Sequence, residues 1–317
     1  MVKIHGVCND TCSAYLLFRG YYDCTHKKGR AYLNIEFYIK NGGMDTVRKQ
    51  GYVIPAVWGV FTFIVYFLAT DNVSIADTIF RMSFGNGEAL FSNSSYLMFC
   101  YMNIAFIHVL YGTKIYRHFC EASVYYFARM GDRRKWILHE FAKLALDIVV
   151  YLGINLAVII ILNLLSGKLE AATAADIFFI IFYLFCFTMF ALTTTLLINL
   201  IAVYISSGAG FALVETVCMA CIAFYCAVGE ATNADCYEYL KKYAFLLWLN
   251  PVCHLFIKIH SSTIDAVNEL INIGGLNFDM GVSALYLPVA CSVTVLIWLI
   301  AIRKMDIMGN NSENQIN

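Results

Sequence analysis

Six long apolar runs are the feature of this chain that most restricts its fold. A helix needs about 20 apolar residues to cross the hydrocarbon core of a bilayer. The runs are continuous rather than alternating, which favours helices over a β-barrel. The sequence therefore predicts an all-α membrane protein with six transmembrane helices, at 52–70, 96–115, 144–165, 177–205, 210–228 and 285–302.

The overall composition supports a membrane protein. Hydrophobic residues make up 60% of the chain and charged residues 14%, with a mean hydropathy of +0.67. These values lie far from those of an average soluble domain. The formal net charge is zero, so the composition gives no reason to expect nucleic-acid binding.

The distribution of Lys and Arg predicts the orientation. With both termini inside, the cytoplasmic side holds 1–51, the region around 116–143, a short turn at 206–209 and the tail 303–317. That side carries 17 of the 22 Lys and Arg against nine acids, and the opposite side carries five against 11 acids. Because basic residues concentrate in cytoplasmic loops, we predict an N-in, C-in topology with a long external segment at 229–284.

The external segment contains a mostly apolar stretch at 243–259, interrupted by Asn250-Pro251. Proline removes a backbone donor and disfavours helix in the residue before it. We therefore predict a re-entrant or interfacial helix pair; a seventh span would place the basic residues Arg303 and Lys304 outside.

The connection at 71–95 is expected to be an ordinary external loop. Pro55 is expected in the first turn of the first span, where its missing N–H costs little.

A basic segment at 117–143 separates the second and third apolar runs. With Lys114 it carries seven of the 22 Lys and Arg. Gly131-Asp132 predicts a break, with Asp132 suited to cap a helix that enters the third span. Binding of anionic lipid, with Trp136 at the interface, is one interpretation of these residues. It does not explain why about 28 residues are needed here when the next cytoplasmic turn needs four.

Two ionisable residues lie inside the predicted spans, and such residues are candidates for function. Asp147 follows Lys143 by four residues, a spacing that predicts an ion pair on one helix face near the cytoplasmic end. Glu215 is expected to reach the membrane surface, a neighbouring helix or the cytoplasmic loop. The fourth run also carries polar residues that either bond to other helices or line a transport path; these are Thr193, Thr194, Thr195 and Asn199.

The sequence contains no pattern for enzymatic chemistry. It has no GxxxxGK[ST] loop, no HExxH and no GxSxG motif, so we expect no ATP hydrolysis by this chain, no cofactor and no metal. Cys8, Cys12, Cys24 and His26 fit no strong zinc template. Cys236 and Cys253 share the external segment and could form a disulfide.

The organisation of residues 44–309 resembles that of the permease subunits of type-2 ABC exporters. The likeness rests on six spans with both ends inside, a basic loop between spans two and three, and the interrupted run NPVCHLF before span six. The ending IAIRKMDIMG is similar to the family's basic exit from the last span. The block ARMGDRRKW is similar to the corresponding loop of small permeases from Gram-positive peptide-export and bacteriocin-immunity systems.

The resemblance implies a division of labour with a separate ATPase. The ATPase would bind the cytoplasmic loop, a second permease copy or homologous permease would complete the path, and a peptide, lipid or drug-like substrate would leave the cell. The protein would be a multi-pass component of a bacterial cell membrane. The implied ATPase-coupling residues are Arg129, Met130, Gly131, Asp132, Arg133, Arg134 and Trp136. The alternative is a non-transport membrane protein such as an immunity, sensor or assembly factor.

The N-terminal residues match no part of this pattern. Residues before the first span would supply the family's amphipathic elbow, within a cytoplasmic segment at 1–51. Met44 opens a natural approach to the first span, so residues 1–43 either belong to the protein or precede its true start.

Overall fold

The computed structural model describes six stretches of the chain: 44–85, 94–122, 133–231, 245–272, 275–276 and 278–311. The chain divides into two compact units, Met1–Gln50 and Gly51–Asn317. Within the first unit only the beginning of one helix is described. The fold discussed below is that of the second unit.

Long helices dominate the described part of the chain. Five are long and apolar enough to cross a membrane, and a sixth apolar helix, Gln50–Tyr66, is shorter. The described strands form one parallel pair, β1 (His260–Ser261) with β2 (Phe278–Asp279). The protein is therefore an all-α, membrane-embedded protein. The long helices are α3 (Met44–Tyr66), α5 (Ser94–Tyr111), α7 (Arg133–Leu165), α8 (Ala174–Tyr204), α9 (Ser207–Ala231) and α12 (Met280–Asn311). The shorter α6 (Lys114–Ala122) follows α5 after a break.

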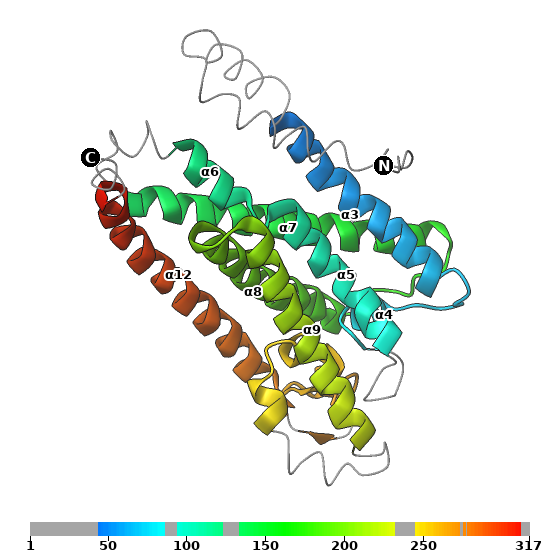
Figure 1. Ribbon diagram of the computed structural model, residues 1–317. Helices are drawn as coiled ribbons and strands as arrows, with labels where there is room; N and C mark the ends of the chain where they lie inside the picture. Colours follow the sequence, from blue (N-terminus) through cyan, green and yellow to red (C-terminus); the bar gives the residue numbers. More distant parts are fainter. Residues whose placement is uncertain are drawn as a thin grey trace, which may run out of the picture. The chain divides into compact units, whose positions relative to one another are not determined.

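Helix α8 is the centre of the helix packing. It contacts α5, α6, α7, α9 and α12, and it lies among them in Figure 1. Phe179, Tyr183 and Phe187 on α8 are fully buried. Trp298 of α12 is also fully buried and donates its indole N–H to the carbonyl oxygen of Leu196, at 2.9 Å. Each such aromatic side chain buries a large apolar area, so α8 anchors the core.

The outward faces of the long helices are apolar. Exposed apolar surface on this scale marks contact with another protein or with lipid rather than with water. The side chains that project outward come from α3, α7, α9 and α12 and include Val57, Ile64, Leu146, Ile161, Leu213, Val217, Val289 and Ile300.

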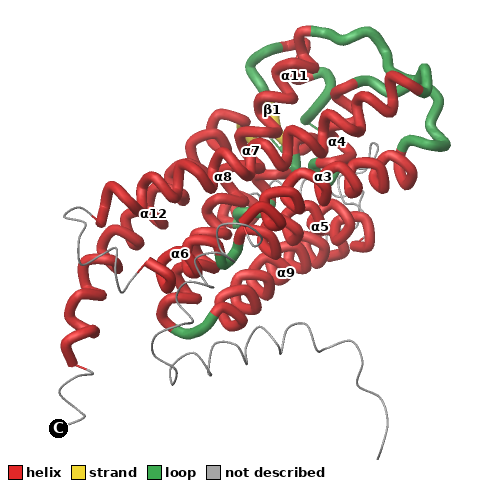
Figure 2. Tube along the Cα trace, turned by 90° about the horizontal axis from the view of Figure 1, so that it is seen from above, coloured by secondary structure: helices red, strands yellow, loops and turns green. Residues whose placement is uncertain are grey.

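Successive helices alternate in direction. Figures 1 and 2 place α6 and the turn between α8 and α9 at one end of the bundle. The same views place α4 (Ile75–Met82) and the segment around β1 at the other end. The turn itself needs a glycine: a Cβ on Gly210 would lie 2.5 Å from the carbonyl oxygen of Ile198. The backbones of α8 and α9 therefore touch at this point.

The first predicted span differs from the helix that the chain forms. Helix α3 begins at Met44 and ends at Tyr66, whereas the hydropathy pattern predicted 52–70. Pro55 therefore lies inside the helix, and its expected position in the first turn is wrong. The carbonyl oxygen of Pro55 accepts a hydrogen bond from Asn155 Nδ2 on α7, at 3.1 Å. A polar side chain of α7 thus bonds the backbone of α3 at this proline.

The connection at 71–95 is not an ordinary loop, because it contains α4. The side chain of Ser74 accepts from the backbone of Asp77, and Asp77 in turn accepts from Ser74, which makes a capping box. Asp176 Oδ1 accepts from the backbone N–H of Ala76, at 2.7 Å, while Asp176 also caps α8 with Thr173. One buried carboxylate therefore joins the beginnings of two helices.

In the segment predicted to be external, the helix ends just before Pro251, where the sequence predicted an interruption. Residues 245–249 are helical and the helix ends at Asn250, so the interruption is confirmed. The second half is not an α-helix but two 3₁₀ turns, η3 (Cys253–Leu255) and η4 (Ile257–Ile259), followed by β1 and the short α11 (Asp265–Asn268). Asn250 Nδ2 donates to the carbonyl oxygen of Cys221, at 2.8 Å, and so fixes the segment to α9.

The remaining helices follow the predicted runs with longer ends. The third run was predicted to begin at 144, but α7 begins 11 residues earlier at Arg133. The second run ends in a break at Gly112, where a Cβ would lie 2.3 Å from the carbonyl oxygen of His108. Beyond that break the chain continues as α6, which the hydropathy pattern did not separate from α5.

Candidate functional site

A cluster of polar side chains joins α5, α8 and α9 inside the bundle. Glu215 Oε1 lies 2.6 Å from His108 Nδ1, and Tyr101 donates its hydroxyl to Glu215 Oε2, at 2.7 Å. His108 Nε2 lies 2.7 Å from the hydroxyl oxygen of Thr194. His108 is fully buried, and the side chain of Glu215 is 15% exposed. Of the three alternatives left open for Glu215, the structure shows contact with a neighbouring helix, α5.

The hydrogen bonds of this cluster connect three helices. The Thr194 hydroxyl lies 2.9 Å from the carbonyl oxygen of Phe190 as well as 2.7 Å from His108 Nε2, and which ring nitrogen of His108 donates depends on its tautomer. The cluster thus links α5, α8 and α9 through polar contacts inside the helix bundle.

Asp147 pairs with a different lysine from the one predicted. It forms an ion pair with Lys114 at the beginning of α6, whereas Lys143 donates to Glu140 Oε1, at 3.0 Å. The predicted Lys143–Asp147 pair is therefore wrong. The i,i+4 spacing placed both on one face of α7, but α6 packs against that helix and supplies a competing cation.

The predicted ATPase-coupling residues lie partly within the described chain. Arg133, Arg134 and Trp136 form the first turn of α7, and Arg134 is exposed. Arg129, Met130, Gly131 and Asp132 lie outside the described residues, so the predicted break and cap stay predictions. The described parts of the basic segment are helical: residues 117–122 belong to α6, and residues 133–143 are continuous with the apolar part of α7.

Helices α6 and α7 are joined by a buried carboxylate near the first turns of α7. Glu140, which is 5% exposed, accepts from His118 Nδ1 on α6, at 2.9 Å, and from Lys143. Asn199 of α8 accepts from the backbone N–H of Tyr116 at 2.9 Å and donates to the carbonyl oxygen of Tyr111 at 3.4 Å. Asn199 therefore holds both sides of the break between α5 and α6.

The remaining polar residues of α8 have separate positions. Thr193 donates to the carbonyl oxygen of Met189, at 2.7 Å, which is a local helix contact. Thr195 is fully buried, and its hydroxyl has no hydrogen-bond partner within the described part of the chain. The structure thus brings Thr194 and Glu215 together through His108 and separates them from Thr193. Sequence reasoning missed His108 and Tyr101; the signal available was that His108 is the one histidine inside a predicted span.

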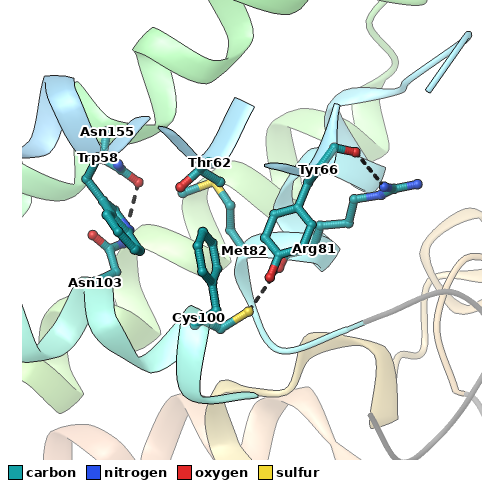
Figure 3. A pocket seen from close by; sticks show the side chains of 9 residues that line it. Trp58, Thr62, Tyr66, Arg81, Met82, Cys100, Asn103 and Asn155 are labelled. Carbon is teal, nitrogen blue, oxygen red and sulfur yellow. Dashed lines mark hydrogen bonds between the residues drawn. The ribbon is translucent and has the colours of Figure 1, made fainter. Parts of the chain in front are cut away.

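A small cleft lies between α3, α4, α5 and α7. Its cavity volume is about 10 Å³, which holds about one water molecule and excludes an organic ligand. Figure 3 shows Asn103 facing Asn155 at one side of the cleft and Arg81 at the other. Arg81 donates to the carbonyl oxygen of Tyr66, at 2.9 Å. The cleft is therefore lined by polar groups that suit water.

Two histidines of the external segment share one serine. His254 Nδ1 and His260 Nε2 lie 2.8 and 2.7 Å from the Ser283 hydroxyl oxygen. Their other ring nitrogens face carbonyl oxygens, of Trp248 for His254 and of Phe256 for His260, and therefore carry hydrogens. Burial lowers the pKa of His254 and lowers that of His260 from 6.5 to about 4. The Ser283 hydroxyl has one hydrogen and can donate it to only one of the two rings. With its lowered pKa, His260 is neutral in the folded protein at pH 7.

Acidification should therefore destabilise the external segment. Below pH about 6.5 the unfolded chain binds protons at these histidines and the folded protein does not, so stability falls from pH 6.5 towards pH 4. For His260 the loss reaches about 3 kcal/mol. Thermal unfolding in detergent between pH 7 and pH 5 measures this loss of stability. His260→Gln should flatten the dependence, and His139→Gln at an exposed site should not; equal slopes in both would contradict the assignment.

The described residues offer no evident metal site. No group of three or more His, Cys, Asp or Glu side chains among them is placed to hold a metal ion. Cys253 is a free, fully buried thiol, and its possible partner Cys236 lies outside the described residues. The N-terminal cluster of Cys8, Cys12, Cys24 and His26 also lies outside them.

Comparison of the chain with protein-family models, curated proteins and solved structures gives no match. The candidate site is therefore assigned from its own geometry. It consists of a buried polar cluster of Tyr101, His108, Thr194 and Glu215 in the bundle and the basic first turn of α7.

Proposed function

We propose that this protein is the membrane-spanning permease subunit of an exporter driven by a separate ATPase, of the type-2 ABC class. In this proposal six helices, α3, α5 and α7 to α9 and α12, cross a bacterial cell membrane with both termini in the cytoplasm. A second copy or a homologous permease completes the path. The substrate class is apolar or amphipathic: a peptide, a lipid or a drug-like molecule.

The observation that carries the proposal is the continuity of α7. This helix of 33 residues runs unbroken from the basic turn at Arg133 to Leu165, a length of about 50 Å. Its cytoplasmic end presents exposed cationic and polar side chains, including Arg134 and His139. A protein that binds that end and moves it would displace the whole of α7, which reaches the opposite side of the bundle.

The contacts of α6 and α7 support the transmission of such a push. Glu140 joins α7 to α6 through His118, and Lys114 joins α6 to Asp147. Asn199 joins the α5–α6 break to α8, the central helix. Closure of an ATPase pair at the cytoplasmic end would therefore move α5, α7 and α8 together and open a path towards the outside.

Purification from the native host tests this proposal. The tagged full-length protein, extracted in a mild detergent, should bring down a soluble ATP-binding subunit, identified by mass spectrometry. The complex should hydrolyse ATP, and the protein purified alone should not. If no ATPase is recovered from crosslinked or uncrosslinked membranes, the exporter proposal fails and a non-transport role such as immunity, sensing or assembly takes its place.

A further inference from the structure

Two buried histidines and the serine between them form a cluster that the proposed function does not use. His254 lies in the 3₁₀ turn η3, and His260 is the first residue of β1. Ser283 lies in the first turn of α12, which begins at Met280. All three side chains are 0% exposed. The cluster therefore joins residues 252–261 to the beginning of α12 from inside the protein.

The contacts of the two rings need more hydrogens than the neutral cluster holds. His254 Nε2 lies 3.0 Å from the carbonyl oxygen of Trp248, and His260 Nδ1 lies 2.8 Å from that of Phe256, so each of these nitrogens carries a hydrogen. The other two ring nitrogens both face the Ser283 hydroxyl oxygen, at 2.8 and 2.7 Å. Since the hydroxyl donates to one ring, the other neutral ring faces this oxygen with a lone pair and no hydrogen.

The same count sets how many added protons the cluster can hold. One added proton gives the second ring an N–H that donates to Ser283 Oγ, and every polar group of the cluster then has a partner. A second added proton gives both rings an N–H directed at this oxygen. The Ser283 hydroxyl hydrogen then loses both ring acceptors, and two positive charges face each other across one oxygen atom. The cluster thus accommodates one extra proton, and a second one breaks it.

The side chains around the two histidines are largely aromatic. His254 stacks on Tyr286, with ring centroids 4.0 Å apart, and Phe278 lies against both histidines. Phe182 of α8 lies edge-on to His260, with centroids 5.6 Å apart. A charge buried in such surroundings is costly unless it is paired. These rings therefore do not compensate for a second imidazolium.

The charged groups near the cluster compensate only in part. Asp279 of β2 acts on His260, but it raises the pKa of that ring less than burial lowers it. Asp279 Oδ1 already accepts from the backbone N–H groups of Gly281 and Val282, at 2.6 and 3.1 Å. Lys258, two residues before His260, adds a positive charge, and its Nζ lies over an aromatic ring of α4. Nothing in this set neutralises two protonated rings.

Residues 252–261 have few regular backbone bonds to hold them in place without the cluster. They contain two 3₁₀ turns of three residues each and β1, which pairs with β2 over two residues. Segments of this kind open locally at a lower free energy than long helices do. Loss of the Ser283 contacts would therefore free this segment before it disturbs the long helices.

We infer that the cluster is an acid-sensitive clasp, in which protonation of both histidines releases residues 252–261 from the first turn of α12 while the long helices stay folded. The protons come from water, and no other reactant is needed. Below pH about 6.5 the open segment holds two protons, and the closed one holds at most one. Each opening therefore takes up about one proton, so acidification favours the open segment. With the topology proposed above, the clasp responds to acidity outside the cell.

Hydrogen exchange measured by mass spectrometry tests the inference. The full-length protein in lipid nanodiscs is labelled from pH 7 to pH 5, and the rates are corrected for the pH dependence of the exchange chemistry. Backbone amides of 252–261 should open about tenfold more at pH 5 than at pH 6, and those of α8 should not change. His260→Gln, which cannot take the second proton, should reduce this factor to less than about twofold. Ser283→Ala removes the shared oxygen and should raise the exchange of 252–261 already at pH 7.

A control variant and the protection of α8 separate the clasp from general acid sensitivity. His139→Gln replaces an exposed histidine of α7 and should keep the wild-type pH dependence. Thermal unfolding at pH 7 shows that each variant is folded. Equal exchange of 252–261 at pH 6 and pH 5, or an equal loss of protection in α8, overturns the inference. So does a His260→Gln protein that keeps the wild-type dependence, or a Ser283→Ala protein with wild-type exchange at pH 7. Both faces of a nanodisc meet the same buffer and no ATP is added, so these results do not depend on the topology or on an exporter role.

Discussion

Replacing Glu215 by alanine should lower the free energy of unfolding by about 3 to 5 kcal/mol, the range found when one partner of a buried ion pair is removed. The change leaves His108 Nδ1 buried without the carboxylate that lies 2.6 Å away, and it also removes the acceptor of the Tyr101 hydroxyl. His108 is fully buried and Glu215 is 15% exposed, so water replaces the lost carboxylate only in part. Reversible unfolding in mixed detergent micelles measures the difference.

A matched control and a double variant isolate the interaction. Thr216→Ala changes the next residue of α9 at an exposed position and should cost less than about 0.5 kcal/mol. Combining His108→Leu with Glu215→Leu removes both partners and should restore part of the loss, because His108 is then no longer buried without its carboxylate, although the Tyr101 hydroxyl still lacks its acceptor. A Glu215→Ala protein as stable as Thr216→Ala would show that the pair contributes nothing.

If the protein works with an ATPase as proposed, reversing the charge at Arg133 and Arg134 should reduce ATP hydrolysis by the complex at least about tenfold. These residues form the first turn of α7, the end at which an ATPase would push on the helix. Acidic side chains there would repel an acidic docking groove on the partner and leave the membrane part of α7 unchanged. ATP hydrolysis by the purified complex, measured per copy of permease, gives the result.

The control must separate an ATPase contact from a lipid contact. Glu170→Lys reverses a charge at an exposed residue between α7 and α8, at the opposite end of α7, and should leave hydrolysis unchanged. The Arg133 and Arg134 variant should be impaired equally in micelles with and without anionic lipid. If the defect appears only when anionic lipid is present, the basic turn binds headgroups and does not couple to an ATPase.

Local hydropathy predicted the long helices because lipid requires each crossing segment to be apolar throughout. It failed where a short or polar element is held by a distant partner. Helix α4 has eight residues, and Asp176, 100 positions away, bonds its first turn. No pattern within 71–95 announces that contact. The 11 helical residues that precede the third apolar run were likewise hidden, because polar residues extend α7 beyond the membrane segment.

In the candidate site too, the sequence indicated single residues but not their distant partners. Glu215 stood out in the sequence as a charged residue inside a predicted span, yet its partner His108 is 107 positions away. Asp147 has Lys143 four residues away, but it pairs with Lys114, which is 33 residues away. Spacing along one helix identifies which side chains share a face. Which neighbouring helix meets that face depends on packing, which one sequence does not determine.

The close contact between the backbones of α8 and α9 at Gly210 bears on how the buried cluster would respond to helix movement. Thr194 on α8 and Glu215 on α9 belong to two helices whose backbones meet there. The groups that contact them, His108 and Tyr101, both belong to α5. The bonds that His108 and Tyr101 make in the cluster therefore all cross between α5 and the α8–α9 pair. The cluster is a latch: sliding of α5, which is followed by α6 after the break at Gly112, would release these bonds together, and return of the helix would close them again.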